Sequence, residues 1–286
     1  MSNDAGGTLW VVATPIGNAE DLGPRAVGVL RAVAVVAAED TRHTGAFLQR
    51  LGVNTPLQSL HEHNERERVA ELLERLAAGE DVALVSDAGT PLISDPGYRL
   101  VRAAAERGMD VRTVPGPSAV TAALSVAGLP TDRFVFEGFL PARAPARRRR
   151  FEELVAEPRT LVFFEASHRV RESVADAAGA FGGDRRAVLA RELTKRFETV
   201  LRGTLRSIGE ALEADPDQRR GEFVLVVAGA EPAARDPEAG DVDGTLRTLL
   251  GELPVKQAVR LAARLTGAAR NRLYQRALEL RDEGPE

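Results

Sequence analysis

The sequence predicts an α/β protein of two domains followed by a small helical extension. Short apolar segments alternate with amphipathic helical segments over the first two domains, which is typical of a parallel or mostly parallel sheet covered by helices. A stretch rich in acidic residues, Pro and Gly then precedes a last helical segment. We expect an N-terminal α/β domain at 1–130, a C-terminal α/β domain at 131–230, a flexible linker at 231–244 and the extension at 245–286.

Four short segments of the first domain are expected to be strands, and the first two of them, which are apolar and contain β-branched residues, are expected to be buried. They span residues 8–14, 33–40, 81–87 and 111–116. Helices are expected between the strands and after the last one. Pro24 suits the first position of a helix, and Gly52 suits the end of a short helix over 43–52.

Polar residues mark the start of two further helices in this domain. Asn64 and Glu67 have the spacing of a capping box. Ser118 suits the N-cap of an Ala-rich helix that ends at Gly128. Between these two helices we expect another helix over 98–107. The first domain is therefore predicted to have a mostly parallel sheet.

The second domain repeats this style with one difference. Its expected strands span residues 134–140, 159–167, 187–194, 198–203 and 222–229. The third and fourth of them are too close in sequence for a crossover helix, so we expect an antiparallel pair and a mixed sheet. In the extension, two apolar stripes separated by Gly267 predict a helix-turn-helix-like pair.

Composition excludes several classes of protein. There is no Cys, so disulfides and thiolate metal sites are excluded, and His61 with His63 does not have the spacing of a zinc site. We expect no metal. No apolar run is long enough to span a membrane, and the N-terminus has no signal-peptide pattern, so we expect a cytoplasmic protein without a membrane partner. The net charge is −4, yet residues 147–150 and 254–276 are locally basic, which suits a polyanionic partner.

Polar and turn-forming residues follow each predicted strand of the first domain. Ligands of open parallel sheets bind outside the carboxyl ends of strands, so these segments together predict a cleft. They are TPIGN at 14–18, EDTR at 39–42, SDAGTP at 86–91 and PGPSA at 115–119. Taken singly, each of these residues also suits a purely structural role. Asp87 could cap a turn, and Ser118 could cap a helix. Glu39, Asp40 and Arg42 could form a surface ion pair.

The loop LVSDAGTPLISDPG has the strand-loop-helix layout of many nucleotide-binding loops but carries Asp87 and Asp95 and no base. No G-x-x-x-x-G-K occurs, and no G-x-G-x-x-G follows the first strand, which disfavours a nucleoside triphosphatase and a nicotinamide dehydrogenase. Carboxylates suit a ligand rich in hydrogen-bond donors or positively charged, and S-adenosylmethionine is such a ligand without phosphate. We expect Asp95 only to turn the chain, outside the site.

Eight segments occur in an order that resembles one family. They are TPIGNAEDLGPRA, AEDTR, SDAGTPLISDPG, VPGPSA, GFLP, FFEASHR, ARELTKRFE and GEFVLVVAG. Together they resemble the ribosomal RNA small subunit methyltransferase I family of the tetrapyrrole-methylase superfamily, over residues 9–229 and in the tail. The resemblance implies a two-domain tetrapyrrole-methylase-like fold with S-adenosylmethionine between the domains. It also implies 2′-O-methylation of a cytidine in the decoding region of 16S rRNA in the small ribosomal subunit, and a homodimer.

The resemblance also implies the cofactor-binding residues. Asp87 and Thr90 match the loop at the methionine and ribose portion, Ser118 and Ala119 match the following helix start, and Pro15 and Ile16 face the methyl donor. Three positions in the second domain match residues near the adenine. They are Phe164, Ala190 and Glu222. TPIGN departs from the Gly-x-Gly-x-Gly form of tetrapyrrole-modifying relatives, which makes a porphyrin substrate less suitable.

The implied reaction is an in-line attack of a ribose oxygen on the sulfonium methyl group. Positioning can supply much of the rate enhancement, and a base or charge-stabilising group would help a weak hydroxyl nucleophile. The catalytic candidates are Glu39, Asp40, Arg42, Glu192 and Lys195, with Glu165 and His168 also near the expected cleft. Arg42, Arg169, Arg191 and Lys195 could instead hold RNA phosphates, and for each candidate a structural salt bridge is an equal alternative.

Two other functions stay open from the sequence. The basic tail could be a DNA-binding module, which would make the protein a ligand-responsive regulator, or it could only pack or form a dimer. The protein could also methylate a tetrapyrrole or another small metabolite. Deleting residues 243–286 separates the first two alternatives from an rRNA enzyme, since donor binding would survive while activity on ribosomal subunits fell.

Overall fold

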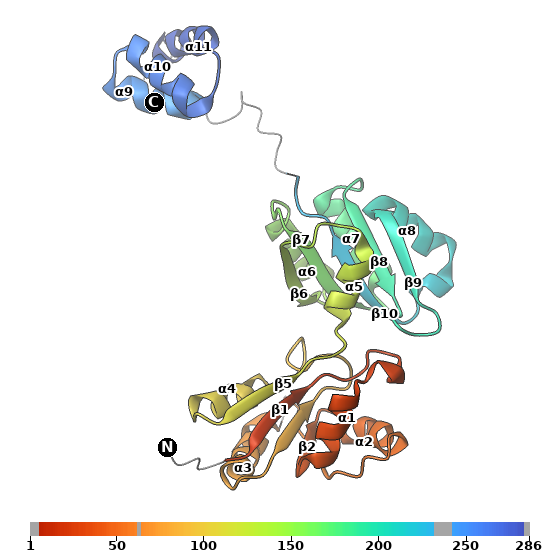
Figure 1. Ribbon diagram of the computed structural model, residues 1–286. Helices are drawn as coiled ribbons and strands as arrows, with labels where there is room; N and C mark the ends of the chain where they lie inside the picture. The colour runs from red at the N-terminus through yellow and green to blue at the C-terminus, as the bar shows by residue number, and fades with distance from the viewer. Residues whose placement is uncertain (1–5, 62–63, 232–241, 283–286) are drawn as a thin grey trace. The chain divides into compact units, whose positions relative to one another are not determined.

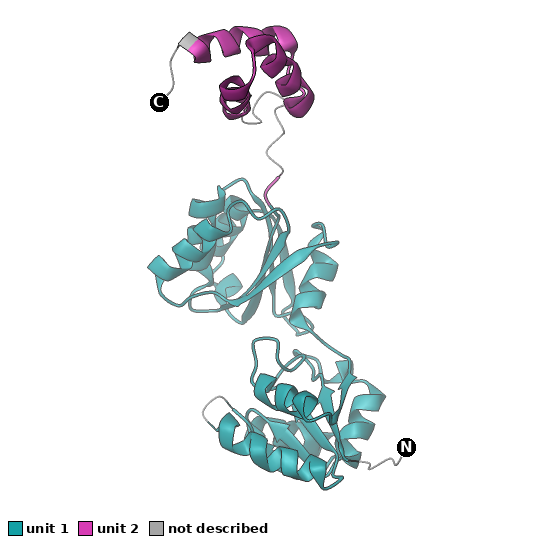
Figure 2. Cartoon of the chain, turned by 90° about the vertical axis from the view of Figure 1, so that its left-hand side faces the viewer, with its two compact units in different colours: residues 1–229 teal, residues 230–286 magenta. Residues whose placement is uncertain are grey.

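The computed structural model describes residues 6–61, 64–231 and 242–282. The chain divides into two compact units, unit 1 over residues 1–229 and unit 2 over residues 230–286 (Figure 2). Within the described residues, unit 1 contains two five-stranded sheets with helices, and unit 2 contains helices only. The predicted α/β class with a C-terminal helical extension is confirmed.

The first sheet of unit 1 is parallel throughout and has the order β3-β2-β4-β1-β5. Figure 1 labels β1, β2 and β5 of this sheet. Its strands are β1 (Thr8–Val12), β2 (Val35–Ala38), β3 (Leu57–Ser59), β4 (Val82–Val85) and β5 (Asp110–Val114). The parallel sheet expected from the sequence is therefore present. Strand β3 was not predicted, because a three-residue edge strand reading Leu-Gln-Ser has no apolar run.

Helices cover both faces of this sheet. Helices α1 (Pro24–Ala32) and α2 (Thr41–Arg50) pack on one face, where Leu30 and Leu48 join a buried cluster. Helices α3 (Glu65–Ala77) and α4 (Tyr98–Glu106) pack on the other face. The central strands β2 and β4 are buried at every position, which is why they read as continuous apolar runs rather than alternating ones.

The capping box predicted at Asn64 and Glu67 is wrong. Asn64 occupies the N-cap of α3, but its side chain makes no capping hydrogen bond. Its Oδ1 instead accepts the backbone N–H of His61 at 2.9 Å, and its Nδ2 donates to the Ser59 hydroxyl at 3.0 Å. The amide therefore ties the end of β3 to the start of α3. The capping-box spacing does not reveal this use of the side chain, because the competing partners lie before the helix.

The second sheet of unit 1 is mixed, as predicted, with the order β6-β7-β10-β8-β9. Its strands are β6 (Phe134–Phe139), β7 (Thr160–Ala166), β8 (Arg186–Arg191), β9 (Thr199–Thr204) and β10 (Glu222–Val227). Strands β6 and β7 are parallel, while the other neighbours, including β8 and β9, are antiparallel. The short connection between β8 and β9 is thus a hairpin turn.

Three helices cover one face of the second sheet and a fourth covers the other. Helices α6 (Ala144–Glu153), α7 (Val170–Phe181) and α8 (Leu205–Ala214) pack on the first face. Helix α5 (Ala119–Ala127) packs on the opposite face. The sequence assigns α5 to the first domain, yet its buried residues contact the second sheet. Short 3-10 turns lie at Ala19–Asp21 and Pro216–Arg219.

Unit 2 is a three-helix cluster within its described residues. It consists of α9 (Val242–Glu252), α10 (Val255–Thr266) and α11 (Arg270–Asp282), packed around Leu246, Val259 and Leu273. Gly267 ends α10 with a positive φ of 75°, as its place between the two stripes indicated. Helix α9 begins inside the segment expected to be a linker, of which 232–241 lies outside the described residues. In the described part of the chain, no helix is long and apolar enough to cross a membrane.

Candidate functional site

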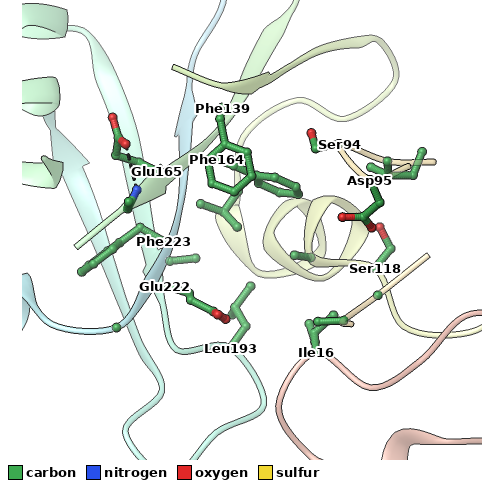
Figure 3. A pocket seen from close by; sticks show the side chains of 18 of the residues that line it. Ile16, Ser94, Asp95, Ser118, Phe139, Phe164, Glu165, Leu193, Glu222 and Phe223 are labelled. Atoms are coloured by element: carbon green, nitrogen blue, oxygen red, sulfur yellow. Dashed lines mark hydrogen bonds between the residues drawn. The ribbon is translucent and has the colours of Figure 1, made fainter. Parts of the chain in front are cut away.

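A cavity of about 450 Å³ lies in unit 1, and residues of both sheets contribute to its wall. The loop after β4 supplies Asp87, Thr90 and Asp95, and the start of α5 supplies Ser118. Figure 3 shows Asp95 and Ser118 on one side of the cavity and Leu193 and Glu222 on the other. Leu193 lies in the turn after β8, and Glu222 begins β10 of the second sheet. The cavity is therefore located where the carboxyl ends of the first sheet's strands meet the second sheet, as such sheets favour.

The structure brings nearly all the predicted cofactor residues together in this wall. They are Ile16, Asp87, Thr90, Ser118, Ala119, Phe164, Ala190 and Glu222. Pro15 instead lines an adjoining cavity. Ser118 occupies the N-cap position of α5, as expected, but its hydroxyl makes no capping hydrogen bond. Its place in the wall is thus not explained by capping.

The adjoining cavity has a volume of about 300 Å³ and shares part of its wall with the first. Ile16, Asp87 and Glu222 line both cavities. The second cavity also contacts His43 and Lys195. Two neighbouring cavities with a common wall suit two reactants that must meet.

The loop at residues 86–97 is held by hydrogen bonds to the segments after β1 and β5 and to the start of α3. Thr14 and Gly89 form a β-bridge, and the Thr14 hydroxyl donates to the Ser86 carbonyl at 3.0 Å. The Thr90 hydroxyl donates to the Pro117 carbonyl at 3.0 Å. At the end of the loop, the buried Glu65 carboxylate accepts the Gly97 N–H at 3.2 Å. The loop is consequently fixed at its start, middle and end.

Asp87 is exposed and lines the cavity, and it also accepts a hydrogen bond from the segment that follows β2. Its Oδ1 accepts the backbone N–H of Asp40 at 3.1 Å. Asp40 itself caps α2 and pairs with Arg42 at 3.0 Å. Hydrogen bonds from the Arg42 guanidinium and backbone hold the pKa of the Asp40 carboxyl at about 2, below its usual range.

Glu39, Asp40 and Arg42 line neither cavity, although the Asp40 N–H donates to Asp87. The structural ion pair that the sequence left open is therefore present for Asp40 and Arg42. A carboxylate with a lowered pKa is also a weak proton acceptor at neutral pH. The geometry therefore favours a structural role for these residues, next to the loop that carries Asp87, over direct contact with the reacting atoms.

Glu192 and Lys195 form a second ion cluster with Glu222. The Lys195 ammonium contacts Glu192 at 3.0 Å and Glu222 at 2.8 Å. Burial alone would lower the pKa of Lys195, but hydrogen bonds to both carboxylates raise it above its usual value. Burial would raise the pKa of Glu192, but the Glu222 backbone N–H and Lys195 lower it. Lys195 therefore remains a cation and lies in the wall of the second cavity.

Asp95, which the sequence placed outside the site, lines the larger cavity. Burial raises the pKa of its carboxyl to about 6, a hydrogen bond from Ser86 opposes the rise, and the charges of Glu39 and Asp87 add to it. The motif SDPG reads locally as a turn. Only the closure of the loop onto Glu65 and Thr14 returns Asp95 to the same edge as Asp87.

The remaining charged candidates have structural partners. Glu165 is buried in the cavity wall, pairs with Arg169 at 2.8 Å and accepts a hydrogen bond from Ser173. Arg191 donates to the carbonyls of Arg220 and Phe197. Among the residues that the structure describes, no group of three His, Cys, Asp or Glu side chains could hold a metal ion.

Comparisons with known proteins match this chain along most of its length. Residues 8–209 match the Tetrapyrrole (Corrin/Porphyrin) Methylases, and residues 236–281 match the RsmI C-terminal HTH domain. The Ribosomal RNA small subunit methyltransferase I of Pseudomonas aeruginosa PAO1 is 56% identical over 274 residues, which cover 96% of this chain and 97% of that protein. The chain belongs to the ribosomal RNA small subunit methyltransferase I family.

Other members of the family support the same assignment. The protein of this name from Escherichia coli O157:H7 is 48% identical over 278 residues, covering 97% of each chain. The members of this family are methyltransferases, so this chain is a methyltransferase.

Among solved structures, a cobalt precorrin-4 methyltransferase of cobalamin biosynthesis has a similar fold. Its TM-score is 0.58 at 17% identity, over 77% of this chain and 94% of that one. The ribosomal RNA small subunit methyltransferase I family thus shares the tetrapyrrole-methylase fold, as the sequence motifs indicated.

Proposed function

We propose that this enzyme transfers a methyl group from S-adenosylmethionine to the 2′-oxygen of a cytidine in the decoding region of 16S rRNA. The observation that carries the proposal is the charge of the larger cavity. Its described lining includes Asp87, Asp95, Glu165 and Glu222 but no Lys or Arg. Glu165 and Glu222 are paired with Arg169 and Lys195, so Asp87 and Asp95 supply the negative charge that faces a ligand. Such a wall disfavours a phosphorylated ligand and favours a cationic nucleoside.

The two sides of the cavity suit the two ends of the methyl donor. Asp87, Thr90 and Asp95 would face the ammonium, the ribose hydroxyls and the sulfonium. Phe164 and Ala190 supply apolar surface for the adenine, and the Phe164 ring packs edge-on against the Phe139 ring at 5.4 Å. These roles agree with those that the sequence motifs implied for Asp87, Thr90, Phe164 and Ala190, and they name the part of the methyl donor that each side of the cavity would contact.

The second cavity suits the acceptor nucleotide. It adjoins the donor cavity at Ile16 and Glu222, and it presents His43, Arg50 and Lys195 to an incoming polyanion. Of the predicted catalytic residues, Lys195 is the one that lines this cavity, and we assign it to holding negative charge near the acceptor. Glu192 would position Lys195 through their ion pair.

The proposed step balances without any further reactant. The ribose 2′-oxygen forms a bond to the methyl carbon, the carbon–sulfur bond breaks, and its electron pair stays on sulfur in S-adenosylhomocysteine. The hydroxyl proton passes to a base or to water. Because the sulfonium is a good leaving group, alignment of the two cavities supplies much of the rate enhancement.

The proposed partner is the small ribosomal subunit, encountered in the cytoplasm. The names of relatives refer to ribosomal RNA of this subunit. A homodimer stays a prediction, and light scattering of the purified protein coupled to gel filtration tests it.

Incubation of unmethylated small subunits with labelled donor tests the proposal. We expect one ribose-methylated cytidine in the decoding region of 16S rRNA, mapped by resistance to alkaline cleavage. Label on the base, on another RNA or on a tetrapyrrole would overturn it. Ligand-dependent DNA binding without methyl transfer would favour the regulator instead.

A further inference from the structure

An exposed aromatic side chain lies in the turn between β8 and β9. Phe197 is 63% exposed. A single exposed apolar residue is common on protein surfaces and carries no meaning by itself. Three further observations point to a binding role for Phe197. They are its position relative to the two cavities, the contacts that fix its turn, and the cation beside it.

The turn that carries Phe197 also builds both cavities. Leu193 is buried and lines the larger cavity, while Lys195 lines the second. Two residues of chain span at most about 7 Å, so the backbone of Phe197 lies within that reach of Lys195. Phe197 lines neither cavity itself, and its backbone lies close to a residue of the wall of the proposed acceptor cavity.

Several contacts hold the turn in one conformation. The Glu198 carboxylate accepts the Thr194 N–H at 2.6 Å, and Arg191 donates to the Phe197 carbonyl at 3.2 Å. The turn also packs on the first sheet's loop, where a Cβ added to Gly17 would lie 2.4 Å from Cγ of Lys195. A ring presented from a preorganised turn loses little conformational entropy when it binds.

A cation accompanies the ring. The Arg196 guanidinium lies over Phe197, 5.4 Å from the ring centroid. Arg196 is exposed and forms no ion pair with the described residues. An aromatic face with an adjacent guanidinium matches an unpaired RNA base and its phosphate, because bases stack on both kinds of group.

We propose that Phe197 and Arg196 form a stacking platform for an unpaired base of the RNA strand, next to the nucleotide that is methylated. This inference rests on the proposed function and adds how the RNA is presented. The platform would hold the neighbouring nucleotide outside the acceptor cavity, so that the target ribose enters it.

Kinetics on small subunits separate this role from a structural one. Phe197→Ala should raise KM for small subunits roughly 5- to 100-fold, the range expected for loss of one stacked base. The kcat at saturation and the donor affinity by calorimetry should stay at wild-type values. Phe197→Trp should restore KM, because the larger ring stacks as well, and Phe197→Leu should not. Phe134→Ala is the matched control, since Phe134 is also exposed, at 40%, and begins β6.

Fluorescence gives a direct readout of stacking. The chain has one tryptophan, Trp10, whose signal in the wild-type protein supplies the baseline. A single-stranded RNA oligonucleotide of the decoding-region sequence should quench the added emission of Phe197→Trp, whereas the corresponding duplex should quench it less.

Three outcomes overturn the platform. They are an unchanged KM in Phe197→Ala, equal quenching by single strand and duplex, or a changed oligomeric state of Phe197→Ala with unchanged subunit binding, which would make Phe197 a contact between two copies of this chain. Wild-type enzyme that leaves small subunits unmethylated refutes the proposed function together with the platform. Wild-type activity with an unaffected variant refutes the platform alone.

Discussion

At the scale of single residues, two carboxylates of one loop have different surroundings. Asp87 is exposed and accepts the Asp40 N–H. Asp95 is half-buried, and burial raises its pKa to about 6. Both line the larger cavity. A cationic ligand would therefore meet one carboxylate that is already solvated and one whose ionisation its own charge favours.

Asp87→Ala should abolish measurable donor binding, because it removes a negative charge from a wall whose described lining includes no Lys or Arg. Asp87→Asn keeps an oxygen for the Asp40 N–H and should bind the donor weakly, which separates the loss of charge from the loss of loop support. Calorimetry with S-adenosylmethionine measures both. Wild-type affinity in Asp87→Ala would contradict the assignment of the cavity.

Donor affinity should depend on pH through Asp95. The carboxyl is neutral below its raised pKa and anionic above it, so affinity for a sulfonium should rise as the pH increases through about 6. If donor binding lowers the pKa of Asp95 by about one unit, the rise is about tenfold. Calorimetric titrations across this range measure it.

Asp95→Asn should flatten this pH profile, because its amide does not titrate, while its fold and loop length are unchanged. The comparison is made with S-adenosylhomocysteine, which lacks the sulfonium charge and should show a weaker pH dependence with the wild-type protein. A profile that persists in Asp95→Asn would assign the titration to another group.

At the scale of elements, the loop at residues 86–97 depends on a contact from α3. The Glu65 carboxylate accepts the Gly97 N–H at 3.2 Å and pairs with Arg99 at 3.2 Å, so it caps the N-terminus of α4. Gly97 has a φ of 116°, and a Cβ there would lie 2.7 Å from Leu84 Cδ2. The sharp exit of the loop thus requires both a glycine and a buried acid.

Glu65→Ala should destabilise the protein by about 1–3 kcal/mol, because it leaves the buried Gly97 N–H without its acceptor. Donor affinity should fall as well, since the loop that carries Asp87 and Asp95 loses its anchor. Urea unfolding and calorimetry measure the two effects. Glu67→Ala, an exposed glutamate on the same helix, is the control and should change stability by less than about 0.5 kcal/mol.

At the scale of the whole molecule, unit 2 has a core of its own. Leu246, Ala262, Leu273 and Ala277 are buried among the three helices. Exposed basic residues lie on the same helices, among them Lys256, Arg260 and Arg264. A separate basic unit can add RNA affinity without taking part in the donor site.

A chain ending at Gly229 should therefore keep its donor affinity and lose most of its activity on small subunits. Unit 1 contains the whole described lining of both cavities. Donor binding by calorimetry and methylation of small subunits are the two readouts. The activity that the full chain shows should also fall with added salt, because phosphate contacts release counterions. Full activity of the shortened chain would remove the RNA role of unit 2.

The sequence by itself determined the fold class, and it predicted most of the residues that the structure gathers in one cavity wall. Periodicity marked the buried strands, and the strand ends together with the family motifs named Asp87, Thr90, Ser118 and Phe164, which the structure brings into one wall. This succeeded because parallel strands have their carboxyl ends at one edge, so local order along the chain already implies proximity.

Only the tertiary structure decided the rest. It placed Asp95 in the wall, packed α5 on the second sheet and tied Lys195 to Glu192 and Glu222. Each of these depends on contacts between segments distant in sequence, and a turn motif, an apolar helix or a charged side chain is compatible with several such partners. Burial and charge pairing, which set the ionisation of Asp95 and Lys195, arise only when the chain closes on itself.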